Sequence, residues 1–333
     1  MARKRSSQNA WMPKGVGRGP SYYYYRPSGT TKTIKLASLD ATPDEVKSAL
    51  VSLLNIKYSF KHMADEYFAS NNFKKLSKHT KNDYEVKAVK KVMPAIGHMA
   101  PNSIGPAALR LYMDIRGETS ETRANIELSF ISTVFSWGYE REKCAHNPAK
   151  GVRKFARKPR QTLITQDEYD LVYEHMPTIC KVAMELSFCC AAREGDLINL
   201  KWEHVSSEGI LIEQSKTAKR QLKLFSTRLV NAIKLAEQIP VFKKYQGKEP
   251  EYVLHTKKGY QYTEDGFRSI WHKNMVAIRK ASKQKLDFTF HDIKAMAVSN
   301  YEGSSRDKQL FSGHKTESQV IVYDRSVQKV KAL

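Results

Sequence analysis

The sequence predicts a multidomain, mainly α-helical protein with small β-sheets (α+β), in which a small sheet-plus-helix module precedes two larger parts. Three observations predict this fold class. The chain has 333 residues, which is longer than one ordinary domain. Strand-like alternation is confined to short stretches near the N-terminus and after residue 208. Elsewhere, apolar residues recur at helical spacing and follow residues that are typical of helix starts.

The strongest global signal is positive charge. There are 56 Lys and Arg residues against 34 Asp and Glu, which gives a formal net charge of +22. Such a surplus favours a nucleic-acid partner, because each phosphate that is neutralised releases condensed counterions. An anionic membrane is the alternative, but neither a basic amphipathic helix nor a lipidation signal supports it. We find no apolar run of membrane-spanning length and no signal peptide, so we expect a soluble intracellular protein.

Residues 1–56 are predicted to form a DNA-binding module. The alternation of Tyr22–Tyr25 and of Thr30–Leu36 predicts two strands. Thr42, followed by Pro43 and with Glu45 three residues on, predicts the start of a helix that continues to about residue 55. A flexible tail attached to a hairpin is the alternative. The basic leading arm supplies three candidate DNA contacts, Arg3, Lys4 and Arg5.

Residues 57–155 are predicted to be helical throughout. Apolar spacing predicts one helix that includes residues 84–93 and another over about residues 106–115, which Gly117 is expected to end. A long helix is then expected over residues 120–142. Its polar positions face either DNA or solvent, and these positions are Asn125, Ser129, Ser132 and Ser136.

A basic linker ends this region and marks the predicted boundary of a C-terminal domain over residues 156–333. Six cations fall within eleven residues around Pro159, so we expect an extended segment that follows a phosphate backbone. The sequence Thr165 to Glu168 is a capping box and predicts the next helix. The candidate DNA contacts of the linker are Arg153, Lys154, Arg157 and Lys158.

Polar residues that suit phosphate chemistry follow in a fixed order through the last 170 residues. Arg193 lies where an apolar helix meets a second helical segment, and a buried guanidinium is costly unless it is used. Two short strands, 209–214 and 221–226, flank a tip that contains several cations. Any one of these residues alone is more often structural, so the prediction depends on their joint order. The candidates are Arg193, Lys216, Lys219, His291, Lys294, His314 and, nine residues later, Tyr323.

These residues and their flanking motifs resemble those of the tyrosine recombinase (phage integrase) family, in particular lambda-type integrases. The matching pieces are Ala-Arg-Glu-Gly-Asp-Leu, Glu-Gln-Ser-Lys-Thr, Phe-His-Asp-Ile-Lys, Leu-Phe-Ser-Gly-His-Lys and Val-Tyr, spread over residues 162–333. The resemblance implies cleavage and rejoining of DNA through a 3′-phosphotyrosine at Tyr323. It implies that Arg193 grips the phosphate, that Asp196 orients Arg193, and that Lys216 is the general acid, with Lys219 as the competing tip lysine. It also implies that His291 and His314 assist by hydrogen bonding or proton transfer.

The resemblance further implies an arm-type module in residues 1–56, a SAM-like core-binding domain in residues 57–155, and a homo-tetramer on duplex attachment sites. The implied reaction integrates and excises a phage or another mobile element without metal, ATP or another cofactor, in the cytoplasm of a bacterial host. A DNA-bending host factor and an excisionase are the implied auxiliary partners. The alternatives are a chromosome-dimer or transposon recombinase, a type IB topoisomerase-like enzyme, and a degenerate recombinase that only binds DNA.

One position departs from the family pattern. The family usually has a second arginine three residues after the first histidine, and here that residue is Lys294. Lysine keeps the charge but loses the bidentate fork of arginine. Three interpretations follow: Lys294 does the work itself, Arg306 from a nearby loop supplies the guanidinium, or the enzyme is weak. The first is favoured, because every other motif is intact.

Overall fold

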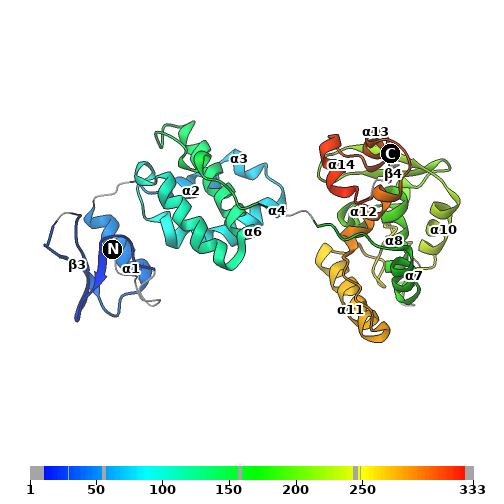
Figure 1. The fold of residues 1–333 in the computed structure, drawn as a ribbon, viewed down its shortest axis with the longest axis horizontal. Helices are drawn as coiled ribbons and strands as arrows, with labels where there is room; N and C mark the ends of the chain where they lie inside the picture. The colour runs from blue at the N-terminus through cyan, green and yellow to red at the C-terminus, as the bar shows by residue number, and fades with distance from the viewer. Residues whose placement is uncertain are drawn as a thin grey trace, which may run out of the picture. The chain divides into compact units, whose positions relative to one another are not determined.

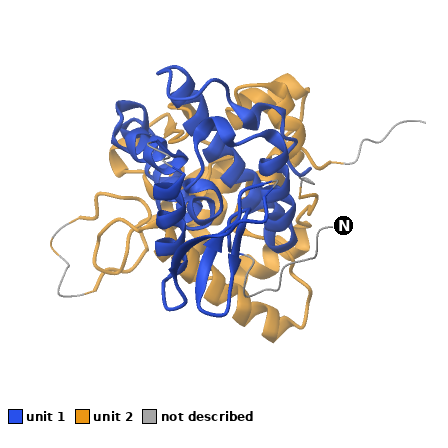
Figure 2. Ribbon diagram, turned by 90° about the vertical axis from the view of Figure 1, so that its left-hand side faces the viewer, with its two compact units in different colours: residues 1–158 blue, residues 159–333 orange. Residues whose placement is uncertain are grey.

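The computed structural model describes residues 11–28, 30–54, 58–156, 160–242, 247 and 249–326. Tertiary contacts divide the chain into two compact units, residues 1–158 and 159–333, which are coloured separately in Figure 2. Both units are mainly helical with short strands (Figure 1), which confirms the predicted fold class. Among the described residues, no helix is both long and apolar enough to cross a membrane. Five predicted DNA contacts lie outside the described residues: Arg3, Lys4, Arg5, Arg157 and Lys158.

The first unit begins with a small sheet and one helix. The strands are antiparallel in the order β1 (Val16–Arg18), β2 (Tyr22–Tyr25) and β3 (Ile34–Ser38). Helix α1 (Pro43–Leu53) starts at the predicted capping box, in which Thr42 and Glu45 bond each other's backbone N–H. Strand β2 confirms the prediction, whereas β3 begins later than predicted and β1 was not predicted. Three residues are too few to display a period of two, so β1 carried no signal.

The rest of the first unit is helical and surrounds a core rich in aromatic side chains. Its elements are α2 (Phe60–Ala69), α3 (Asn71–Lys74), α4 (Lys78–Lys81), the π-helix η2 (Asn82–Ala88), α5 (Val89–Val92), the π-helix η3 (Met93–Gly97), the 3-10 turn η4 (Pro101–Ser103), α6 (Pro106–Tyr139) and the 3-10 turn η5 (Pro148–Gly151).

Helix α6 consists of two helices that meet at a kink, which confirms the two helices predicted here. The helical hydrogen bonding continues through Gly117, and the kink comes at Ser120, whose φ of −166° and ψ of 104° are not helical. A Cβ on Gly117 would lie 2.4 Å from the ring of Phe155. The first of the two predicted helices therefore continues past Gly117, which serves close packing, and ends at Ser120.

The polar face of α6 holds the following segment. Asn125 is buried, and its side chain makes two 2.9 Å hydrogen bonds with the backbone of Phe155. The amide nitrogen of Asn147 donates to Ser132 and to Ser136. These side chains therefore attach residues 147–155 to the helix. The interpretation of this face as a DNA contact is not supported for Asn125, which is buried.

The second unit packs its elements around the buried helix α8, against which α10 and α12 lie (Figure 1). The elements are α7 (Gln166–His175), α8 (Thr178–Cys190), α9 (Glu194–Ile198), the 3-10 turn η6 (Trp202–His204), β4 (Gly209–Glu213), β5 (Arg220–Leu224), α10 (Thr227–Ala236), α11 (Glu264–Ser282), α12 (Phe290–Asn300), α13 (Ser305–Ser312) and α14 (Glu317–Tyr323). The predicted capping box at Thr165 and the predicted hairpin are both present.

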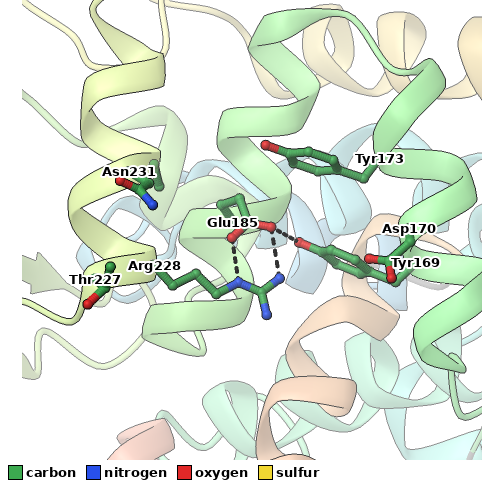
Figure 3. A pocket seen from close by; sticks show the side chains of 8 residues that line it. Tyr169, Asp170, Tyr173, Glu185, Thr227, Arg228 and Asn231 are labelled. Carbon is green, nitrogen blue, oxygen red and sulfur yellow. Dashed lines mark hydrogen bonds and ion pairs between the residues drawn. The ribbon is translucent and has the colours of Figure 1, made fainter.

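An ion pair on one side of this unit connects α7, α8 and α10 (Figure 3). Glu185 of α8 receives two hydrogen bonds from the guanidinium of Arg228, at 2.5 and 2.8 Å, and a third from the hydroxyl of Tyr169 at 2.8 Å. The guanidinium also lies 4.1 Å from the ring centroid of Phe188. Because the carboxylate is satisfied by groups from both neighbouring helices, it can be buried at low cost.

We expect Arg228→Met to destabilise the second unit by about 3 kcal/mol, because it leaves a buried carboxylate without its cation. Unfolding of the full chain in urea measures the effect. The double variant Glu185→Leu with Arg228→Met should recover more than half of the loss, since no buried charge remains. A double variant that is less stable than Arg228→Met alone would contradict this account.

Candidate active site

Arg193 projects from a turn that Asp196 fixes. Helix α8 ends at Ala191 in the left-handed conformation, and Arg193 is the N-cap residue of α9. The buried Asp196 accepts from the backbone N–H of Arg193 at 3.3 Å, and its other oxygen accepts from the N–H and hydroxyl of Ser215, both at 2.9 Å. The guanidinium itself donates to Gln214 at 3.2 Å. Asp196 therefore joins the arginine turn to the hairpin loop.

The hairpin loop between β4 and β5 carries both candidate lysines. The loop is closed by a 2.9 Å hydrogen bond from the N–H of Gln214 to the carbonyl of Lys219, and Ala218 takes a positive φ of 52°. Lys216 is exposed and Lys219 is half-buried. Both line a cavity of about 600 Å³, which is completed by Thr217, Arg306, Gln309, Leu310, Gly313, His314 and Lys315. Lys216, Lys219 and His314 therefore line the same cavity.

Lys294 lies on α12 and is fully buried. Its ammonium donates to the carbonyl of Ala191 at 2.5 Å and to that of Ser312 at 3.3 Å. Burial, and next the nearby charge of Arg193, lower the pKa of Lys294 to about 7. The ammonium therefore connects the ends of α8 and α13, and it is close to losing its proton at neutral pH.

His314 follows Gly313, which ends α13 with a positive φ of 69°. The hydroxyl of Ser312 donates to the carbonyl of Lys308 at 2.7 Å, so its oxygen must accept from Nδ1 of His314 at 2.6 Å. Nε2 of His314 is buried and has no hydrogen-bond partner among the described residues. Burial, and next the charge of Lys294, lower the pKa of His314 to about 3. The ring is therefore neutral, with the lone pair on Nε2.

Tyr323 is the last residue of α14, and its hydroxyl lies 3.0 Å from Nε2 of His291. The ring centroids of Tyr323 and His314 are 4.5 Å apart. The ammonium of Lys294 lies 5.7 Å from the ring centroid of Tyr323. Desolvation of the imidazole, and next the charge of Lys294, lower the pKa of His291. A neutral His291 can accept the proton of the tyrosine hydroxyl.

Contacts on both sides of Tyr323 anchor its backbone. The hydroxyl of Ser299 donates to the carbonyl of Tyr323 at 3.3 Å and accepts from the N–H of Arg325 at 2.8 Å. Asp324 pairs with Lys308 at 2.7 Å, and Arg325 pairs at 2.7 Å with the buried Asp292, which follows His291 in sequence. The segment that carries the tyrosine is thus attached to the start of the helix that carries His291.

The remaining predicted residues fall elsewhere. Arg153 and Lys154 belong to the first unit and are exposed, and Lys154 donates to Ser129 at 2.8 Å. Arg306 lies in the first turn of α13, and the loop predicted for it is absent; its guanidinium donates to Gln309 at 2.7 Å. The sequence-based candidates omitted Gln214, although it stands within the Glu-Gln-Ser-Lys-Thr match. That match was the available signal for it.

The family model described as "Phage integrase family" matches residues 162–329, and that described as "Phage integrase central domain" matches residues 60–155. The integrase of Escherichia phage HK022 is 22% identical, over 97% of this chain and 96% of that protein.

Two solved structures are also similar. A lambda integrase dimer bound to a COC′ core site has a TM-score of 0.68 and 20% identity, covering 99% of both chains. A lambda integrase tetramer bound to a Holliday junction has a TM-score of 0.66 and 18% identity, covering 92% of this chain and 97% of that one. The model of the phage integrase family matches half of the residues of this chain. The chain therefore belongs to the phage integrase family and is a site-specific tyrosine recombinase.

Proposed function

We propose that this recombinase cleaves duplex DNA with Tyr323 and holds the broken strand as a 3′-phosphotyrosine. One observation carries the proposal: the hydroxyl of Tyr323 lies 3.0 Å from Nε2 of His291, beside the buried cation of Lys294. A nucleophile within hydrogen-bond distance of a neutral base is the arrangement that nucleophilic catalysis requires. The surrounding positive charge suits a phosphodiester, whose non-bridging oxygens gain charge during transfer.

The proposed reaction balances without a co-reactant. The oxygen of Tyr323 attacks phosphorus as its proton passes to His291, and the bond from phosphorus to the 5′-oxygen breaks. Lys216 gives that oxygen a proton, which leaves a free 5′-hydroxyl. Arg193 holds the non-bridging oxygens. The open Nε2 of His314 donates a hydrogen bond to them only after it takes up a proton, which the negative charge of the phosphate favours. Attack by a 5′-hydroxyl on the phosphotyrosine reverses these steps and rejoins the strand.

Lys294 takes the place of the usual second arginine in this proposal. Two of its three N–H groups are engaged by the carbonyls of Ala191 and Ser312, which leaves one for a phosphate oxygen. An arriving phosphate would favour the charged ammonium and so offset the cost of its burial. Arg306 is exposed and bonded to Gln309, so it is the weaker candidate for this role.

We further propose three functional parts: an arm-type DNA-binding module in residues 1–56, a core-binding domain in residues 57–155 and the catalytic domain in residues 156–333. The net charge of +22 supports binding to duplex attachment sites. The similarity to a lambda integrase tetramer on a Holliday junction supports a homo-tetramer that integrates and excises a mobile element. We place it in the bacterial host cytoplasm, with a DNA-bending factor and an excisionase as partners.

Tyr323→Phe should abolish covalent attachment to DNA while leaving DNA binding intact, because only the nucleophilic oxygen is lost. A nicked suicide substrate carrying the attachment site traps the adduct, which gel electrophoresis in detergent then separates. Tyr301→Phe is the matched control, since Tyr301 is a partly exposed tyrosine of the same unit that stacks on Phe311. An adduct formed by Tyr323→Phe would rule out Tyr323 as the nucleophile.

Lys294→Ala should slow single-turnover cleavage of the same substrate by about 100-fold or more, as expected for loss of one donor to the transition state. Lys294→Arg should not exceed the wild type, because a larger side chain would have to fit into a fully buried site. The exposed Lys285→Ala serves as the control. Unchanged cleavage by Lys294→Ala would show that another cation performs this role.

The melting temperature of Lys294→Met relative to that of the wild type, both without DNA, should be higher at pH 6 than at pH 9. The folded-state pKa of about 7 lies below the ordinary value of 10.5, so the unfolded chain holds this proton more tightly. Wild-type stability therefore rises with pH between those two values, whereas methionine lacks this dependence. Calorimetry at both pH values measures the difference in melting temperature between Lys294→Met and the wild type. If this difference were equal at the two pH values or more positive at pH 9, the buried charge of Lys294 would not destabilise the folded protein as described.

A further inference from the structure

Side chains of the β4–β5 hairpin donate to three consecutive carbonyls at the end of α13. The amide of Gln221 donates to the carbonyl of Leu310 at 2.6 Å, and the ammonium of Lys223 donates to that of Phe311. The amide of Gln214 donates to the carbonyl of Ser312 at 3.1 Å. The first two donors are on β5 and the third follows β4, so the donors stand on both sides of the lysine-bearing loop.

These contacts stabilise both the end of α13 and the hairpin. The last carbonyls of a helix have no partner within that helix, and a cation near them also interacts favourably with the helix dipole. Lys223 supplies such a cation, and burial lowers its pKa to about 8. A two-stranded hairpin is in turn only marginally stable without packing. Docking on α13 therefore satisfies the helix end and holds the hairpin.

Gly313 permits the close approach. A Cβ at this position would lie 2.2 Å from the amide nitrogen of Gln214 and 2.4 Å from the amide oxygen of Gln221. The next residue is His314, whose ring lies against Tyr323. The same short stretch of chain thus receives the hairpin and supports the histidine beside the nucleophile.

We infer that Gln221 and Lys223 are positioning residues, which dock the hairpin on the end of α13 and so set its loop lysine for proton delivery to the leaving 5′-oxygen. The inference rests on the proposed function, in which Lys216 is that lysine. Gln214 makes a similar contact, but it also bonds Arg193, so a change there would disturb the phosphate grip as well. Gln221 and Lys223 have no contact with Arg193, His291 or Tyr323 among their described hydrogen bonds.

A substrate whose leaving group needs no proton distinguishes a role in positioning the loop lysine from a role in the stability of the fold. In ordinary DNA, breaking the phosphorus–oxygen bond leaves an alkoxide that must be protonated. When sulfur replaces the bridging 5′-oxygen, breaking the phosphorus–sulfur bond leaves a thiolate, which is a far weaker base than an alkoxide and can depart without first receiving a proton. A defect in proton delivery therefore appears with the oxygen substrate and disappears with the sulfur substrate.

The experiment measures single-turnover cleavage by the full chain, at saturating enzyme, of both substrates in the same nicked attachment site. Gln221→Met and Lys223→Met each remove a donor while keeping an apolar stem of similar length. We expect each to slow cleavage of the oxygen substrate by at least about 10-fold, as a small misplacement would. Cleavage of the sulfur substrate should stay within about 3-fold of the wild type, since general acid catalysis contributes nothing there.

Three controls accompany these variants. Gln166→Met removes a glutamine that bonds Asp170 on the exposed part of α7, and it should leave both rates unchanged. Lys216→Ala and Lys219→Ala identify the proton donor. The variant that lacks the donor should show the largest slowing that is specific to the oxygen substrate. Melting temperature and DNA affinity confirm that each variant is folded.

Equal slowing of both substrates, or of neither, by Gln221→Met and Lys223→Met would overturn the inference. If Lys216→Ala still shows an oxygen-specific defect in that case, the proposed function stands and only the docking role fails. If neither Lys216→Ala nor Lys219→Ala distinguishes the substrates, the assignment of a loop lysine as general acid fails as well.

Discussion

The buried ammonium of Lys294 holds the second unit's polar centre together. It stands on α12 and donates to the carbonyl of Ala191, at the end of α8, and to that of Ser312, at the end of α13. A charge so far from solvent is costly, and the charge of Arg193 adds to the cost. The two carbonyls offset part of it. Ala191 presents its carbonyl from a left-handed conformation that non-glycine residues seldom adopt, so local backbone strain accompanies the contact.

The surroundings of Tyr323, the proposed nucleophile, depend on this centre. Burial, and next the positive charge of Lys294, lower the pKa of His291 and that of His314. Both imidazoles are therefore held neutral, one to accept a proton and the other with an open nitrogen. The tyrosine itself is held from outside the cation cluster, through the pairing of Arg325 with Asp292 at the start of α12. The acid–base properties and the geometry of the site thus depend on the same helix.

The sequence predicted the parts of the fold that have short-range signals. Capping boxes, the hairpin and the ordered motifs up to Tyr323 depend on neighbouring residues, which is why they could be recognised. Gly117 misled because a glycine that avoids a neighbouring ring looks the same in sequence as one that ends a helix. Donors to backbone carbonyls, such as Gln221 and Lys223, have no sequence signature, because any residue supplies the acceptor.

Among the described residues of the site, cationic groups outnumber carboxylates, and this imbalance suits the phosphate of the proposed reaction. Asp196 is the carboxylate that pairs with Arg193, at 3.9 Å, and both of its oxygens are already used by backbone and side-chain donors. Neither oxygen of Asp196 is therefore free to compensate the remaining positive charge. A phosphate would stabilise the charged form of Lys294 and so relieve the largest cost in the centre. In the proposed function, binding of the scissile phosphate and the stability of residues 159–333 are therefore coupled through one buried proton.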